Sequence, residues 1–228
     1  MKEYAYLHCH TTYSIKDAIP TCEAYVNKIY DLNQKDNSDY HCKGFAVTDH
    51  GVIFAFPKTY NACLNPKDEN KKINPVYGCE IYMCDDIDNN ENKDRFHLVL
   101  LASTQKGLSN LYEIASFSGL HQLKGKIKDF PLVDMKFLET HGEGIVCLTA
   151  CIAGIVPYYI LNGDIPRAMQ YIEKFNNIFD KVYLEVQPHD FPEQLWVNNA
   201  LVNISLNNPQ YKLVMTPDSH YIEIKDKE

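Results

Sequence analysis

The sequence predicts an α/β fold in which about seven strands alternate with helices in one domain of 228 residues. Short apolar runs bounded by turn residues alternate with segments whose apolar residues recur at helical spacing, which favours a mainly parallel sheet. No internal repeat, linker or low-complexity segment divides the chain, so we predict that residues 1–228 form a single domain. This alternation is typical of a distorted (β/α)7 barrel, whose active site lies at the carboxyl ends of the strands.

The predicted strands cover residues 4–9, 44–47, 75–82, 96–102, 144–148, 181–186 and 211–215. The predicted helices cover residues 20–32, 54–63, 105–117 and 133–139, and two more begin after Asp164 and near residue 192. Residues 33–40 read as a polar loop, and Asp164 and Pro166 suit a helix N-cap and first turn. An acidic, Asn-rich turn at residues 85–94 should join an antiparallel ribbon that sets Glu80 beside His97.

Composition and charge exclude several classes of protein. The hydrophobic fraction of 45% is ordinary for a globular chain, and no apolar run approaches the ~20 residues that span a bilayer. The start of the chain lacks the layout of a signal peptide, so we expect a cytoplasmic protein without membrane contact. A formal net charge of -8 argues against broad electrostatic binding of a nucleic-acid duplex. The eight cysteines contain no CxxC pair, which argues against a zinc ribbon or a disulfide framework.

Two pairs of metal-binding residue types stand at opposite ends of the chain. His8 and His10 end the first predicted strand, where side chains at i and i+2 point the same way, and Asp17 follows in the next loop. Asp218 and His220 end the last strand. Neutral imidazole is a common metal ligand. Either pair alone also fits an incidental spacing, but their coincidence at two strand ends indicates a metal site.

Further candidate ligands follow other strands. His50 lies just after the second strand in a Thr-Asp-His-Gly turn, Cys151 follows the fifth, and Glu80 and His97 belong to the expected ribbon. Such a turn also fits a helix cap, and Cys151 also fits a core position. Because strand ends in a barrel meet at one rim, we predict that the side chains outside the ribbon share one site.

These residues occur in motifs that resemble the polymerase-and-histidinol-phosphatase (PHP) family, most closely the PHP domain at the N-terminus of the bacterial DNA polymerase III alpha subunit. The motifs run in family order over nearly the whole chain. They are residues 8–14 (HCHTTYS), 48–51 (TDHG), 78–82 (GCEIY), 96–102 (FHLVLLA), 149–154 (TACIAG), 161–164 (LNGD), 184–187 (LEVQ), 192–194 (PEQ) and 218–221 (DSHY).

The resemblance implies a distorted seven-stranded, TIM-like (β/α) barrel that binds up to three divalent metal ions. Imidazole and carboxylate ligands suit zinc, manganese or iron, and a thiolate at Cys151 favours zinc or iron. Catalytic roles are expected for His50, Asp218 and His220, with His189 as a further candidate for proton transfer. The implied metal-ligand positions are His8, His10, Asp17, His50, Glu80, His97, Cys151, Asp218 and His220.

The sequence departs from the family pattern at a few places. Ala18 stands where the family usually has glycine after the first-motif aspartate, which predicts a reshaped loop, and residues 33–40 look slightly extended. The palm, thumb and fingers of the polymerase, with their catalytic carboxylates, have no counterpart in these 228 residues. We therefore expect no polymerase activity in this chain.

The implied activity is hydrolysis of a phosphate ester by a metal-activated water. The polymerase context implies the 3′ end of DNA as substrate, and hence a 3′–5′ exonuclease of the proofreading type. Its partners would be the remaining polymerase domains or replication subunits. Lys124, Lys126 and Lys128 suit either contact with the DNA backbone or a plain solvated loop. Two alternatives stay open: a small-molecule phosphatase of the histidinol-phosphatase type, and a non-catalytic, metal-stabilised docking module.

Overall fold

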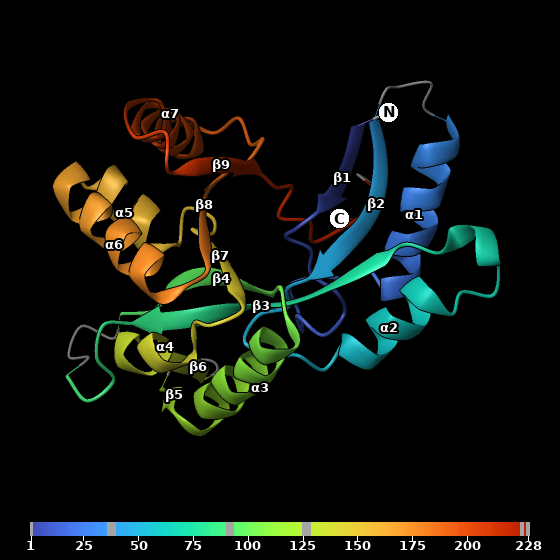
Figure 1. Ribbon diagram of the computed structural model, residues 1–228, viewed down its shortest axis with the longest axis horizontal. Coiled ribbons are helices and arrows are strands. Elements are labelled where there is room, and N and C mark those ends of the chain that lie inside the picture. The colour runs from blue at the N-terminus through green and yellow to red at the C-terminus, as the bar shows by residue number, and fades with distance from the viewer. Residues whose placement is uncertain (1, 36–39, 90–93, 125–128, 224–225, 227–228) are drawn as a thin grey trace.

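The fold is known from a computed structural model, which describes residues 2–35, 40–89, 94–124, 129–223 and 226. Seven strands form one curled sheet with helices on its outer side (Figure 1). Of two short further strands, β6 (Phe130–Asp134) pairs with the C-terminal end of the third strand, and β5 (Gln122–Leu123) pairs with β6. The order of the seven is β1 (Lys2–Tyr6), β2 (Tyr40–Val47), β3 (Asn74–Cys84), β4 (Phe96–Ala102), β7 (Ile145–Leu148), β8 (Lys181–Val186) and β9 (Lys212–Met215).

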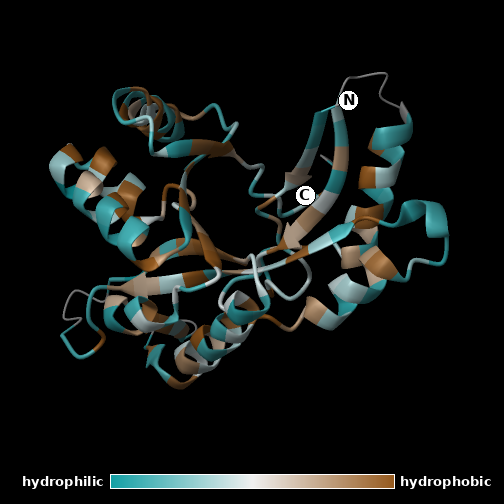
Figure 2. Ribbon diagram, in the orientation of Figure 1, coloured by the Kyte–Doolittle hydropathy of each residue, from teal (hydrophilic) through white to brown (hydrophobic). Residues whose placement is uncertain are grey.

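Helices alternate with the strands, as the sequence predicts. Four of them begin at a side-chain cap, because Thr21, Thr104, Asp134 and Asp164 each accept a backbone N–H of the first turn. Figure 2 shows hydrophobic residues concentrated on the central strands and hydrophilic residues on the outward turns of the helices. The helices are α1 (Cys22–Lys35), α2 (Phe56–Leu64), α3 (Gln105–Leu120), α4 (Met135–His141), α5 (Ile155–Leu161), α6 (Ile165–Ile178) and α7 (Pro192–Asn207), with a short 3₁₀ turn at Glu69–Lys71.

The sheet is mainly parallel and its two edges meet at one point. Strand β4 runs antiparallel to both β3 and β7, and the other neighbours on the seven-strand path are parallel. Just beyond β1 and β9, the His10 amide donates to the Ser219 carbonyl at 2.9 Å, and the Ser219 amide donates to the His8 carbonyl at 3.2 Å. The result is a curled half-barrel, and the predicted α/β barrel class is confirmed.

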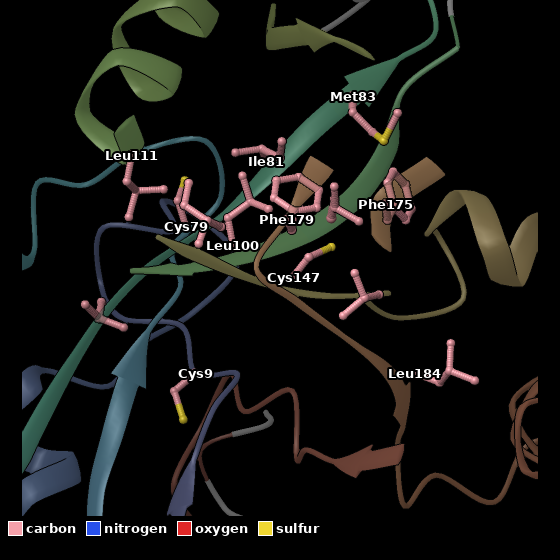
Figure 3. Packing of buried hydrophobic residues seen from close by; sticks show 14 of the residues in the cluster. Cys9, Cys79, Ile81, Met83, Leu100, Leu111, Cys147, Phe175, Phe179 and Leu184 are labelled. Carbon is pink, nitrogen blue, oxygen red and sulfur yellow. The ribbon is translucent and has the colours of Figure 1, made fainter. Parts of the chain in front are cut away.

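Strand alternation separates the packed core from the inner face of the sheet. On β3, Cys79, Ile81 and Met83 are buried in one cluster with residues of the surrounding helices (Figure 3). Glu80 lies between them in sequence and therefore points to the opposite, inner face. That face carries a small apolar cluster of its own, which includes Val99. The polar site residues are therefore held on the inner face by a hydrophobic layer behind it.

Several predicted bounds differ from the structure. Strand β1 ends at Tyr6, before the two histidines, whereas β2 begins at Tyr40 within the predicted loop 33–40. Strand β3 continues to Cys84, two residues past its predicted end, and stops just before the predicted acidic turn at residues 85–94, of which residues 90–93 lie outside the described chain. Strands β5 and β6 and helix α5 were not predicted from the sequence. Two of these elements contain a proline, Pro131 in β6 and Pro157 in α5, and all three are too short to show a periodic pattern.

The antiparallel ribbon of β3 and β4 is present, but its expected register is wrong. Glu80 pairs with Val99, and His97 pairs with Tyr82, so the hairpin is centred one residue later than predicted. Glu80 and His97 are therefore diagonal neighbours on the same face rather than direct partners. The diagonal spacing still lies within reach of these two side chains.

Gly144, just before β7, is closely packed, and Gly163, which has the same φ angle, provides a matched control for this packing. Gly144 and Gly163 both have φ of +75°, but a Cβ on Gly144 would lie 2.1 Å from Thr104 Oγ1, whereas one on Gly163 would meet nothing within 4 Å. We expect Gly163→Ala to lower the free energy of unfolding by about 1 kcal/mol, through backbone strain alone. Gly144→Ala should lower it by about 3 kcal/mol, because overpacking is added to the strain. Urea denaturation measures both, and equal losses would contradict this account of Gly144.

Candidate metal centre

A buried carboxylate, Glu80, lies at the middle of the inner polar cluster. It is 1% exposed. Its Oε1 is 2.9 Å from His97 Nδ1, and its Oε2 is 2.8 Å from His50 Nδ1, 3.3 Å from His10 Nε2 and 3.6 Å from His8 Nε2. Residues that follow β1 and β2 and a residue of β4 thus direct four imidazoles at one side chain.

A second carboxylate, Asp218, closes the cluster from the end of the chain. Its Oδ1 lies 3.3 Å from His8 Nε2, 3.4 Å from His10 Nε2 and 3.6 Å from His220 Nδ1. Asp218 has φ of +46°, in the left-handed region that aspartate tolerates better than most residues. This turn after β9 brings both Asp218 and His220 to the histidines that follow β1.

The two remaining candidates lie at the edge of the cluster. Asp17 Oδ2 is 2.8 Å from His50 Nε2 and 3.7 Å from His220 Nε2, while Cys151 Sγ is 3.6 Å from His97 Nδ1. The structure therefore brings all nine predicted ligand positions into one contact network, including the ribbon pair. That these residues bind metal stays a prediction.

The loop that holds Asp17 makes its sharp turn one residue before it. The positive φ of +67° falls at Lys16, whereas Ala18, which replaces the usual family glycine, is buried and donates its amide to the Ser14 carbonyl. The loop therefore accommodates alanine and still places the Asp17 carboxylate against His50.

His8 is oriented by a buried glutamate that the sequence analysis did not assign. Glu185 Oε1, on β8, lies 2.6 Å from His8 Nδ1 and also accepts hydrogen bonds from Gln187 Nε2 and Thr216 Oγ1. An ionised carboxylate accepts only, so Nδ1 carries the proton in the neutral ring. The lone pair of His8 Nε2 then faces Glu80 and the cluster.

His10 is oriented in a similar way, through a serine. Its Nδ1 lies 3.0 Å from Ser14 Oγ, and the Ser14 hydroxyl donates to Asp49 Oδ1 at 2.7 Å. Because that proton is already donated, Ser14 accepts from His10 Nδ1–H, which leaves His10 Nε2 as the free nitrogen. His220 Nδ1 lies 3.0 Å from the Asp218 carbonyl, which can only accept. Three imidazoles thus present Nε2 lone pairs.

The inward position of Glu185 could have been predicted from the sequence. In the strand KVYLEV, Val182 and Leu184 belong to the outer hydrophobic core, so alternation places Glu185 on the inner face. A carboxylate at an inner position of an apolar strand requires a buried partner. The role of Asp49 could not be predicted from the sequence in this way. Its contacts depend on the loop that contains Ser14, and only its place next to His50 marked it.

The donor set fits divalent cations. Five buried atoms of this cluster have no hydrogen-bond partner among the described residues: His8 Nε2, His10 Nε2, His50 Nδ1, Glu80 Oε2 and Asp218 Oδ1. Leaving buried polar atoms unpaired is costly, and their convergence is explained if cations take the lone pairs. The three sets whose ligand atoms lie within 4.8 Å of one another are His8–His10–Glu80, His50–Glu80–His97 and His10–His50–His220.

Burial and the neighbouring charges strongly shift the pKa values of several side chains in the cluster. Burial works against the charged form of His8, yet Glu185, Asp218 and Glu80 outweigh it and raise the pKa of His8 well above its usual value. Burial likewise works against ionised Glu80, but the imidazoles of His8 and His97 hold its pKa well below the usual range. Burial, reinforced by Glu80 and Asp218, raises the pKa of the Cys151 thiol. Cys151 therefore becomes a thiolate ligand only with a cation beside it.

The weaker sequence candidates fall outside the cluster. His189 lines a pocket next to Asp17 and His220, and contacts none of the nine positions through a described hydrogen bond. Lys124 is exposed and forms an ion pair with Asp129 at 2.9 Å, while Lys126 and Lys128 lie outside the described residues. The described part of the chain contains no helix long and apolar enough to cross a membrane.

A curled β/α sheet whose strand ends bear clustered imidazoles and carboxylates is the architecture of metal-dependent hydrolases. The model of the PHP domain family matches residues 6–189, so the chain belongs to the PHP family. PHP domains are metal-dependent, and the histidine and glutamate clusters described above are able to hold such ions.

Curated relatives carry the name DNA polymerase III subunit alpha, which confirms the resemblance to that version of the family. The protein from Aquifex aeolicus is 31% identical over 99% of this chain, and the one from Borreliella burgdorferi is 33% identical over 98%. The chain spans about a fifth of the length of these relatives (19% and 18%). A solved amidohydrolase from Chromobacterium violaceum superposes with a TM-score of 0.52 at 12% identity, covering 95% of this chain and 87% of the other, and supports the fold alone.

Glu185→Gln tests the orientation of His8. Glutamine keeps the size of the side chain but offers a weaker acceptor to His8 Nδ1, and loss of such a partner typically costs 10- to 100-fold in metal affinity. We expect an affinity loss of at least about 10-fold for zinc or manganese, measured by competition with a chromogenic chelator. Glu139→Gln, exposed on α4, is the matched control. Equal affinities in the two variants would show that Glu185 does not act through His8.

Metal binding should release protons. Because the pKa values of His8 and His10 are raised in the metal-free protein, both rings hold protons that a cation must displace. The apparent metal affinity should therefore rise with pH through the neutral range, where displacement becomes easier. Calorimetric titration in buffers of different ionisation enthalpy measures the protons released per ion. A heat independent of the buffer would contradict this expectation.

Proposed function

We propose that this chain is a metal-dependent phosphoester hydrolase that removes nucleotides from the 3′ end of DNA. The observation that carries the proposal is that five buried, unpaired ligand atoms gather in one cluster on the inner face. The polymerase III alpha relatives support DNA as the substrate. The complete set of nine ligand-type side chains supports an active centre over a purely structural one.

The charge of the loaded site suits a phosphate in spite of the acidic chain. Divalent ions, when bound, lower the pKa of a water molecule and neutralise charge on phosphate oxygens. Up to three such ions would bring six positive charges against three carboxylates, Asp17, Glu80 and Asp218, and one thiolate, Cys151. The surplus is positive. An anionic phosphodiester is therefore attracted locally although the chain carries a net charge of -8.

Three residues have proposed roles in the reaction itself. His50 Nδ1 faces the buried centre, 2.8 Å from Glu80 Oε2, while its Nε2 lies 2.8 Å from Asp17 Oδ2, so Nε2 is the ring atom at which a proton would be exchanged with Asp17. Asp218 and His220 line a pocket beside the cluster and face both the buried histidines and the substrate space. We assign ligand and orienting roles to Asp218 and His220, and proton transfer to His50.

The proposal is tested by assays of metal-loaded protein on two substrates. Purified protein is analysed for zinc, manganese and iron and then given 3′-labelled single-stranded DNA or a generic phosphomonoester. We expect the 3′ label to be released at once as a mononucleotide, because a 3′–5′ exonuclease removes the terminal nucleotide first. His10→Ala and Asp218→Asn should lower both the bound metal and the rate, the rate by about 100-fold or more, because the first removes an imidazole ligand and the second removes a carboxylate charge from the centre. His121→Ala, which changes an exposed imidazole outside the cluster, should keep both.

Each alternative result of these assays would support a different function or overturn the site. Hydrolysis of the phosphomonoester without cleavage of DNA would establish a small-molecule phosphatase. Metal binding that raises the melting temperature without hydrolysis of either substrate would establish a structural docking module. Equal metal content in wild type and in both ligand variants would overturn the site itself.

A further inference from the structure

A pocket of about 600 Å³ opens beside the metal centre and has two kinds of lining. Asp17, Asp218 and His220 belong to the predicted ligand set. Ile19, His189 and Tyr221 do not, and they supply apolar or ring surface; we call these three the base-contact surface. The volume lies within the range of small-molecule pockets, about 300 to 1,000 Å³. A ligand in this pocket therefore meets ionic and organic surface together.

The base-contact surface is exposed although its backbone is fixed. Ile19 is 56% exposed and Tyr221 is 39% exposed, so neither side chain is committed to the core. The Ile19 amide donates to the His220 carbonyl at 3.2 Å, and the Ser219 hydroxyl donates to the Tyr221 carbonyl at 3.0 Å. These bonds tie the surface to the same loop that carries Asp218 and His220. The surface and the metal centre therefore keep a fixed relation to each other.

His189 extends this surface from another element. It follows β8, and its ring lies nearly parallel to that of Phe191, with centroids 6.0 Å apart and an interplanar angle of 19°. His189 is partly exposed and lines the pocket, and it belongs to none of the three groups of described residues whose ligand atoms could hold a metal. The ring thus has a supporting neighbour and an available surface.

We propose that the base-contact surface binds the nucleobase of the terminal nucleotide while its phosphate lies at the metal centre. This inference rests on the proposed function and specifies the substrate as a nucleotide unit with an unstacked base. Every base has a π face, so stacking on rings such as Tyr221 and His189 tolerates any sequence. Asp226, which also lines the pocket, disfavours a phosphate at its own position and so favours this orientation.

The binding mode has a consequence for the DNA end. A base can lie on the surface only after it leaves the stack of its neighbours, and leaving is easiest at a single-stranded or mismatched end. The pocket should therefore select frayed 3′ ends over paired ones without reading their sequence.

A matched pair of substrates separates the base from the phosphodiester. One is a 3′-labelled single-stranded oligonucleotide, and the other has the same sequence with an abasic 3′-terminal nucleotide. Wild-type protein should cleave the intact end with kcat/KM about 10-fold above that of the abasic end, as base stacking on an aromatic side chain suggests. Tyr221→Ala should lose this preference through a higher KM, and Tyr221→Phe should keep it. Tyr158→Ala, which changes a tyrosine of similar exposure on α5, is the control.

Binding supplies a readout that is independent of turnover. Calorimetry on metal-loaded protein should give about 10-fold tighter binding of dAMP than of deoxyribose 5-phosphate, and Tyr221→Ala should abolish the difference. Equal cleavage of the two DNA ends by wild type, or an equal loss on both ends in Tyr221→Ala, would overturn the base-contact surface. Absence of all DNA cleavage with a retained dAMP preference would instead overturn the proposed hydrolysis and leave the surface in place.

Discussion

A buried carboxylate that meets four imidazoles, Glu80, is the constraint on which the rest of the molecule depends. A fully buried ionised group is tolerated only with partners that compensate its charge. Here the partners come from the ends of β1 and β2 and from β4, with Asp218 opposite. The curled sheet is therefore the frame that brings these strand ends together, and removing one member would leave the others uncompensated.

The hydrophobic layer and the outer polar contacts hold this cluster in two complementary ways. On β3, alternate residues face the helices, so the position of Glu80 follows from the burial of Cys79 and Ile81 on either side of it. Behind the histidines, Glu185 and the Ser14–Asp49 pair occupy the Nδ1 atoms. Packing fixes where each side chain is, and the hydrogen bonds fix which nitrogen faces inward.

The sequence predicted the parts of this structure that depend on local pattern. The α/β order, the mainly parallel sheet and the nine inward positions followed from apolar runs, from residues at strand ends and from family motifs. The β3–β4 register did not, because a turn rich in Asp and Asn allows several hairpin centres and only the packing of both faces selects one. Glu185 was quoted within a motif but given no role, since its partner His8 is 177 residues away. The short, proline-containing elements α5 and β6 were missed because they owe their form to tertiary contacts.

The bridge between Cys9 and Ser219 is a long-range contact next to the candidate metal centre. It joins the first strand end to the last across 210 residues, so the pair is among the most non-local contacts in the chain, and such contacts form late. During synthesis, His8 and His10 leave the ribosome long before Asp218 and His220 exist. The early part of the chain therefore offers a cation only a partial set of ligands. The complete set of ligand side chains comes together only once the sheet has curled, so a cation that needs the full set would bind only after that step.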